Sequence, residues 1–288
     1  MPAGHTHTRR PRRLAPAVLA LGAAAALPAA HAGVTFDVIG PHEYELPVGF
    51  EPFNVFVQYG FVQQNDRVYD AGGDRVSGDG SQQIVGQSKY VRFWTPESNP
   101  DVGLAWEVIV PEIAVRNREA AEGERRRSGI GDPLTGFATW IKPADGLVLG
   151  LQSFASVPVG ASEVSDTNWK NLTSVFWDWR GEALGWTGDA GFVWQGERDD
   201  GTRPGLTWHT NNRFGWRASR HLEPFLALDY EHTRASDDYD SSWVVDGGAG
   251  LMLHTFENQS LTFRYSTSLD GRNHVVADSW NLKYAYAW

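Results

Sequence analysis

The chain has 288 residues, of which 41% are hydrophobic and 12% aromatic, and it carries a formal net charge of −10 and no cysteine. The lack of cysteine excludes a disulfide scaffold and a thiolate metal site, and the acidic charge argues against a nucleic-acid partner, which would need a basic surface. The mean hydropathy is −0.38 and the only long apolar run lies at the start, which excludes a bundle of membrane helices.

Segment 1–32 has the features of a secretory signal peptide. Four arginines at positions 9, 10, 12 and 13 precede the apolar run 14–30, and Ala30-His31-Ala32 forms an A-x-A cleavage motif. A membrane anchor is the alternative, but the run is short for a span and two prolines interrupt it. We therefore expect export, with cleavage after Ala32.

From residue 53 onward the chain alternates apolar and polar residues, which is typical of β-strands. The clearest segment is the last, in which Trp280, Leu282, Tyr284, Tyr286 and Trp288 share one face. Clusters of Gly, Asp, Asn and Pro separate the segments. The pattern predicts twelve strands, at 53–64, 86–95, 102–112, 134–143, 146–158, 171–180, 184–197, 205–218, 222–233, 242–254, 259–269 and 278–288.

The predicted connections alternate between long and short along the chain. The long ones are 65–85, 113–133, 159–170, 198–204, 234–241 and 270–277. An even number of strands with this alternation is typical of a bacterial outer-membrane barrel, which has short periplasmic turns and long outer loops. A closed antiparallel barrel also pairs every backbone polar group within the hydrocarbon. The predicted fold class is therefore all-β, a transmembrane antiparallel β-barrel of about 12 strands. A soluble sandwich or jelly roll is the alternative.

The chain ends on an aromatic residue at the tip of its best alternating strand. Such a C-terminal strand is similar to the assembly signal of outer-membrane proteins, which usually end in Phe. We assign this signal to Trp280, Tyr284, Tyr286 and Trp288. The barrel is predicted over 53–288. The preceding segment 33–52 either plugs the lumen or remains in the periplasm as a leader.

Several short motifs resemble the outer-membrane transporter family associated with the MetA pathway of phenol degradation (SphA-like proteins). They are Leu46-Pro47-Val48-Gly49, Ser128-Gly129-Ile130-Gly131-Asp132-Pro133, Val157-Pro158-Val159-Gly160 and the C-terminal strand. Val159 stands where such proteins often carry threonine. The resemblance, from about Glu45 to Trp288, implies a monomeric outer-membrane barrel that passes hydrophobic or aromatic compounds.

Strand parity places a mixture of acidic and basic side chains inside the barrel. They are Asp178, Arg180, Asp189, His209, Asn211, Arg213, Arg217, Glu223, Asp229, Glu231, Asp246, Arg264 and Lys283. Opposed charges at a constriction would filter solutes that diffuse through. The alternative is that these groups neutralise one another in a narrow, filled barrel. The best candidates for lining the path are Arg213, Arg217, Asp229, Glu231, Asp246, Arg264 and Lys283.

The loops suggest weaker sites, and no catalytic, metal or cofactor site is assigned. Residues 70–80 faintly resemble a calcium-binding turn, and Arg125, Arg126 and Arg127 would suit lipopolysaccharide phosphates, although both segments also fit plain solvated loops. The expected partners are outer-membrane lipid and lipopolysaccharide, the barrel-assembly machinery, and small hydrophobic or aromatic solutes.

The predicted function is therefore passive uptake of such solutes through an outer-membrane channel, by a protein that is not an enzyme. A structural or adhesive barrel without transport is one alternative. A second is an outer-membrane acyl hydrolase, for which His232 and Ser241 face each other across an outer loop, with Asp237 or Asp238 to orient the imidazole.

Overall fold

The computed structural model describes residues 39–122 and 125–288. The predicted signal peptide, 1–32, and residues 33–38 lie outside the described residues. Among the described residues, no helix is long and apolar enough to cross a membrane.

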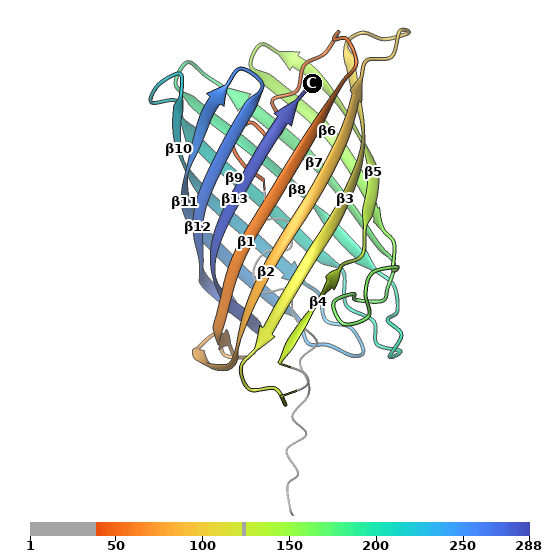
Figure 1. Ribbon diagram of the computed structural model, residues 1–288, viewed down its shortest axis with the longest axis vertical. Helices are drawn as coiled ribbons and strands as arrows, with labels where there is room; N and C mark the ends of the chain where they lie inside the picture. Colours follow the sequence, from red (N-terminus) through yellow and green to blue (C-terminus); the bar gives the residue numbers. More distant parts are fainter. Residues whose placement is uncertain (1–38, 123–124) are drawn as a thin grey trace, which may run out of the picture. The chain divides into compact units, whose positions relative to one another are not determined.

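The strands of the described chain form one closed antiparallel barrel (Figure 1). They are β1 (Phe53–Tyr69), β2 (Arg75–Trp94), β3 (Val102–Asn117), β4 (Arg126–Ile130), β5 (Leu134–Ala144), β6 (Leu147–Ser156), β7 (Lys170–Arg180), β8 (Leu184–Gln195), β9 (Thr207–Trp216), β10 (Leu222–Thr233), β11 (Ser242–Phe256), β12 (Gln259–Arg272) and β13 (His274–Ala287). The last strand pairs with the first, from Val55↔Ala287 to Tyr69↔His274, and β2 pairs with both β1 and β3. The circuit of β1 to β3 and β5 to β13 is therefore closed, whereas the short β4 pairs with β3 alone.

The expected number of twelve barrel strands is confirmed, because β4 and β5 share one position in the circuit. Both pair with β3, which meets β5 over residues 102–109 and β4 over residues 112–116. Residues 131–133 separate the two strands, and Gly131 donates its N–H to the carbonyl of Pro111 on β3 (2.8 Å). The strand predicted at 134–143 is thus the longer part of a broken strand.

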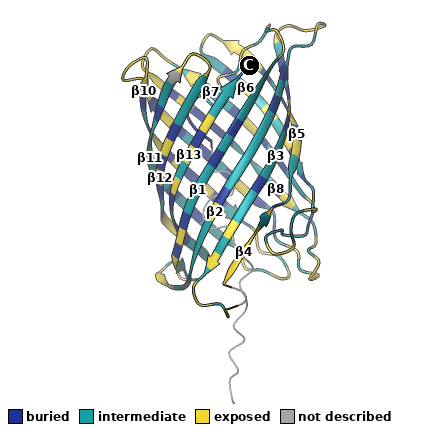
Figure 2. Cartoon of the chain, in the orientation of Figure 1, coloured by how far each residue is buried: buried dark blue, intermediate teal, exposed yellow. Residues whose placement is uncertain are grey.

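More buried and more exposed residues alternate along many strands (Figure 2), as the sequence predicts for a wall with two different faces. On β9, Thr207, His209 and Arg213 are buried in the barrel, whereas Trp208 and Phe214 are exposed on the outside. This period of two residues is what a sheet with one face outward and one inward requires.

The regularly alternating apolar side chains of β1 do not face outward, so the expectation drawn from alternation is wrong for this strand, and β2, whose segment alternates too poorly to predict its facing, behaves in the same way. Val57 and Tyr59 of β1 and Phe93 of β2 are buried inside the barrel. On the outer side, the Ser88 hydroxyl lies 2.8 Å from carboxamide and carboxylate oxygens of Gln58 and Glu112. The reason is that the lumen beside these strands is filled by apolar side chains from the N-terminal segment, so the wall there is apolar on its inner face.

The alternation of loop length is also weaker than expected. The first turn spans residues 70–74 rather than 65–85, and Asn273 alone joins β12 to β13 in a left-handed conformation (φ 48°). Strand pairing continues through polar residues, for example Gln63↔Gln83 and Gln64↔Gln82, where neither face is apolar. Hydrophobic alternation therefore vanishes before the hydrogen-bonded ladder ends.

The N-terminal segment runs inside the barrel, and we call its residues 39–50 the plug. Ile39 and Tyr44 are buried in a core with the inward-facing Val91, Trp140 and Phe176. The Tyr44 ring stacks on Phe176 at 4.4 Å. Trp140 donates its indole N–H to the carbonyl of Pro47 (2.7 Å). Apolar packing thus holds the plug against β2, β3, β5, β6 and β7.

Glycines opposite the two large aromatic rings make room for this core. A Cβ on Gly103 would lie 2.1 Å from the ring of Trp140, its cross-strand partner, and a Cβ on Gly150 would lie 2.1 Å from the ring of Phe176. Each ring covers the backbone of its glycine, an arrangement that also stabilises strand pairing.

Candidate functional site

The candidate site is the barrel interior, where the plug meets charged side chains from strands around the circuit. The Glu43 carboxylate accepts a hydrogen bond from Tyr59 (2.8 Å), forms an ion pair with Lys283 of β13 and lies 3.8 Å from Lys89 of β2. Burial alone would raise the pKa of Glu43, but Lys283 and Lys89 lower it to about 2. The plug therefore contributes a buried negative charge that is held by two lysines.

Lys89 has a second carboxylate partner on the wall. Its ammonium lies 2.8 Å from Glu107 of β3, so Lys89 contacts one carboxylate of the wall and one of the plug. Glu43, Lys89, Glu107 and Lys283 thus form one network of alternating charge that joins the plug to three strands. Buried charges of this kind persist only when they are paired and hydrogen-bonded.

The next residue of the plug contacts the opposite side of the wall. The Tyr44 hydroxyl donates to Asp189 of β8 (2.9 Å) and accepts from Gln152 of β6 (3.2 Å). Asp189 also accepts from Asn211 (2.7 Å). Burial, together with the charge of Asp189, raises the pKa of Tyr44 well above its usual range. Glu43 and Tyr44 therefore bridge the lumen between distant strands.

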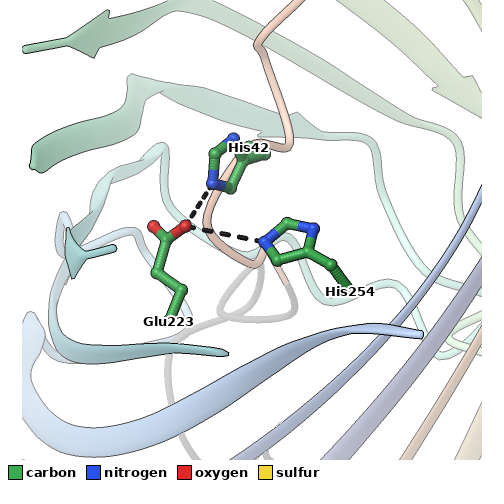
Figure 3. A group of neighbouring side chains, drawn as sticks. All are labelled: His42, Glu223 and His254. Atoms are coloured by element: carbon green, nitrogen blue, oxygen red, sulfur yellow. Dashed lines mark hydrogen bonds and ion pairs between the residues drawn. The ribbon is translucent and has the colours of Figure 1, made fainter. Parts of the chain in front are cut away.

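His42 anchors the plug near the end of the barrel where the β9–β10 and β11–β12 connections lie, which we call the turn end. Its Nε2 lies 2.5 Å from Glu223 of β10, and its Nδ1 contacts Glu45. Burial alone would lower the pKa of His42, but the hydrogen bonds with Glu223 and Glu45 raise it above its ordinary value. His254 of β11 lies 3.7 Å from the same Glu223 oxygen (Figure 3). Among the described residues, His42, Glu223 and His254 form the one group of three metal-ligating side chains.

Six of the seven residues predicted to line the path are buried inside the barrel: Arg213, Asp229, Glu231, Asp246, Arg264 and Lys283. Arg213 contacts Asp229 at 2.5 Å and donates from Nε to the carbonyl of Ile39 in the plug (2.8 Å). Arg264 lies 3.6 Å from the other oxygen of Asp229. Arg217 is different, because it follows the last residue of β9 and is exposed at the mouth of the barrel. Their role in transport stays a prediction.

The residues assigned to the assembly signal lie along β13 and just after it. Trp280, Tyr284 and Trp288 are exposed on the outer face, and Tyr286 stacks on Trp288. Trp288 exchanges two backbone hydrogen bonds with Asn54 at the seam of the barrel (2.9 and 3.0 Å). Their role in assembly also stays a prediction.

Sequence reasoning missed the plug residues and their partners on β2 and β3. Lys89 lies in a segment that alternates poorly, and nothing local marks His42, Glu43 or Tyr44 as inward-facing. The β10–β11 hairpin offered one usable signal, because its register Glu223↔Met252 places His254 near Glu223. The partner from the plug, 181 residues earlier than Glu223, had no such signal.

Two cavities of the barrel interior lie on either side of the plug. One, of about 230 Å³, lies toward the end where the β6–β7 loop contributes Val164 and Asp166. The other, of about 780 Å³, opens at the turn end, where residues 217, 219–221 and 254 line it. The side chains that border both are Glu43, Tyr44, Lys89, Glu107 and Gln152. These five side chains, which we call the constriction, lie between the two cavities.

Comparison with solved structures identifies the same architecture in outer-membrane proteins. An outer membrane channel from Pseudomonas putida F1 is similar with a TM-score of 0.76 at 16% sequence identity, over 87% of this chain and 100% of that chain. The β domain of the Bordetella autotransporter BrkA is similar with a TM-score of 0.51 at 14% identity, over 83% of this chain and 100% of that chain. At these identities the likeness shows the fold. No curated protein matches the chain.

A family described as "Putative MetA-pathway of phenol degradation" matches residues 65–284. The matched region contains all the strands except parts of the first and last. This confirms the resemblance seen in the short motifs. Because the match spans more than half of the chain, the protein belongs to this MetA-pathway family, and its fold is that of the outer-membrane β-barrels.

Proposed function

We propose that the protein is a passive channel of the bacterial outer membrane for small hydrophobic or aromatic compounds. The observation that carries this proposal is the pair of cavities on either side of the constriction. Solutes would enter the smaller cavity, pass the constriction and leave through the larger one. Movement of the plug would open the path, because its contacts with the wall are side-chain contacts and not strand pairing.

The lining of the smaller cavity suits a solute with an apolar ring. Phe61, Phe154, Leu172 and Val193 face it, together with polar groups such as Gln152. A cavity of about 150 Å³ is enough to hold benzene in another protein, so about 230 Å³ has room for a single substituted ring. Charged side chains such as Lys170 and Asp189 also line it, so the cavity offers apolar contact together with polar groups that can orient a small organic molecule.

The comparisons with known proteins support the same proposed function. The similar Pseudomonas putida protein is named as an outer membrane channel, and the family description refers to phenol degradation. Phenolic compounds combine an aromatic ring with one hydroxyl group, which matches the mixed lining. The remaining expected partners are outer-membrane lipid, lipopolysaccharide and the assembly machinery, and we propose that the channel works as a monomer.

The two alternatives receive less support. Among the described residues, no hydrogen bond joins His232 to Ser241, so the dyad required for acyl transfer is not assembled. We propose that the protein is not an enzyme, in line with its similarity to a solved outer membrane channel. A purely structural barrel would not need two cavities bordered by a shared charged constriction.

The test is current through the purified protein in a planar bilayer, with phenol added to one side. We expect phenol to interrupt the current in a concentration-dependent manner, because the ring occupies the smaller cavity. Val193→Trp should abolish the interruptions, since Val193 is buried and lines that cavity. Val175→Trp is the matched control, because Val175 is exposed on the outside of the neighbouring strand.

The proposal fails if phenol leaves the current unchanged, or if Val193→Trp and Val175→Trp respond alike. A heat-dependent shift in gel mobility should first show that both variants form the barrel. Hydrolysis of ester substrates that Ser241→Ala abolishes would instead favour the acyl hydrolase.

A further inference from the structure

His42, Glu223 and His254, which we call the plug–wall triad, bring three metal-ligating side chains to one point (Figure 3). His42 comes from the plug, Glu223 from the start of β10 and His254 from β11. Their candidate ligand atoms all lie within 4.8 Å of one another, and the Glu223 oxygen is 2.5 Å from His42 Nε2 and 3.7 Å from His254 Nε2. Ligand atoms around a tetrahedral Zn²⁺ lie about 3.4 Å apart, so small side-chain movements would admit the ion.

The chemistry of the donors selects the class of metal. Two imidazole nitrogens and one carboxylate oxygen suit Zn²⁺ and similar transition-metal ions. Ca²⁺ and Mg²⁺ prefer sites made only of oxygen. Three protein ligands leave a fourth position for water.

Neighbouring groups orient two of the three ligands. Glu45 contacts Nδ1 of His42, so Nε2 is the nitrogen directed at Glu223. A carboxylate on the far nitrogen is the usual support of a metal-binding histidine. Arg180 lies 3.3 Å from Oε1 of Glu223, which leaves Oε2 facing both histidines.

The backbone and the surroundings also fit a site that ions can reach. His42 has a φ of 62°, in the left-handed region that favours glycine, and such conformations are often held at binding positions. Glu223 is 1% exposed, whereas His254 is 32% exposed. Both histidines line the cavity of about 780 Å³ that opens at the turn end. The carboxylate is thus buried behind two histidines that the cavity makes accessible.

We propose that the plug–wall triad binds a Zn²⁺ ion and that this ion ties the plug to the barrel wall. An ion that binds only when His42 lies beside Glu223 and His254 stabilises the inserted plug by mass action. Zn²⁺ would therefore keep the path closed. The binding of Zn²⁺ by the triad does not depend on the proposed transport function. Only the expected effect of Zn²⁺ on the current rests on that function.

The binding test uses the purified full-length barrel in detergent, stripped of metal and titrated with ZnCl₂ in a calorimeter. We expect one Zn²⁺ per chain, and the visible absorption of four-coordinate Co²⁺ when CoCl₂ is used instead. His254→Ala should abolish this binding, and Glu45→Gln should weaken it by about 10- to 100-fold. His232→Ala is the matched control, because this histidine lies at the other end of β10. The site is refuted if the wild-type protein binds no Zn²⁺, or if His254→Ala binds it as the wild-type protein does.

The second test is the current through single channels before and after micromolar Zn²⁺ is added at the turn end. We expect Zn²⁺ to lower the frequency of open events at least tenfold, a chelator to restore it, and His254→Ala to be insensitive. Mg²⁺ at the same concentration should have no effect, which separates ligation from general screening of the mouth. Stoichiometric Zn²⁺ binding without a change in current would overturn the tie between plug and wall while leaving the metal site in place. A barrel with no current at all but normal Zn²⁺ binding would count against the transport proposal alone.

Discussion

The guanidinium of Arg213 lies 2.5 Å from the carboxylate of Asp229, and both side chains are completely buried. Arg213 also donates to the carbonyl of Ile39, and Arg264 approaches the second oxygen of Asp229. The pair therefore joins β9 and β10 to the plug. Arg213, Asp229 and Arg264 therefore connect the plug to the barrel wall, in addition to any contact they make with a solute.

We expect Arg213→Ala to lower the free energy of unfolding by about 3–5 kcal/mol, because it removes the 2.5 Å ion pair of the buried Asp229 and a hydrogen bond to the plug. Urea unfolding in detergent, followed by tryptophan fluorescence, measures this difference. The matched control is Arg67→Ala, which breaks the ion pair between Arg67 (44% exposed) and Asp278 (35% exposed). That change should alter the free energy of unfolding by about 1 kcal/mol or less. Equal losses in the two variants would contradict the structural role of Arg213.

Strand number and the facing of β9 to β13 were predictable from sequence, because these strands meet different surroundings on their two faces. Trp208 and Phe214 point outward and Arg213 points inward, so the alternation is clear. The same reasoning fails for β1, and the poor alternation of the β2 segment predicts no facing. The inner face of both strands meets the plug, where Val55 of β1 and Phe93 of β2 pack into the apolar core.

The interior site could not be predicted because its contacts join residues that are distant in sequence. Lys283 and Glu43 are separated by 240 positions, and Asp189 and Tyr44 by 145. A local pattern identifies which side chains face inward, but it does not decide whether the segment 33–52 plugs the lumen or remains in the periplasm, the two placements predicted for it. The sequence therefore predicted the inward-facing residues of the wall individually, but it did not predict which residues of the plug contact them.

The charge of Glu43 makes the position of the plug depend on pH. Its pKa is lowered from 4.5 to about 2 in the inserted plug, and a released plug would titrate near the ordinary value. The stabilisation is therefore complete above about pH 4.5, and it is lost as the pH falls from there through about 2. We expect the open frequency of single channels to rise across that window.

Glu43→Gln should show a raised open frequency already at pH 7, and the acid-induced rise between pH 4.5 and 2 should be smaller, with the remainder due to Glu45, whose pKa is lowered by its hydrogen bond with His42. Glu51→Gln is the control, because Glu51 belongs to the same N-terminal stretch but is exposed. If Glu43→Gln kept the pH response of the wild-type channel, another group would be responsible for it.

The outer face of β13 should tolerate no charge near the middle of the bilayer. Leu282 is 43% exposed on that face, beside the exposed Trp280. Leu282→Arg should reduce the free energy of folding into vesicles by about 2–4 kcal/mol, because the guanidinium would have to enter hydrocarbon. Val159→Arg, in the loop between β6 and β7, places the same charge outside the strands and should leave folding unchanged. Folding yields at several urea concentrations compare the two, and an unaffected Leu282→Arg would mean that this face does not meet lipid.

We expect the backbone of Trp288 to act in the barrel seam and its side chain to act in assembly, and the two roles can be tested separately. Its backbone is fixed by Asn54 at the seam, while its indole is 52% exposed and stacks on Tyr286. Since the backbone bonds do not depend on the side chain, Trp288→Ala should refold unaided in detergent nearly as well as the wild-type chain. Insertion by purified barrel-assembly machinery in proteoliposomes should fall several-fold, and Trp288→Phe should restore it because an exposed terminal aromatic ring is retained. Equal losses with and without the machinery would show that the indole contributes to barrel stability, and recognition would then have to reside elsewhere on β13.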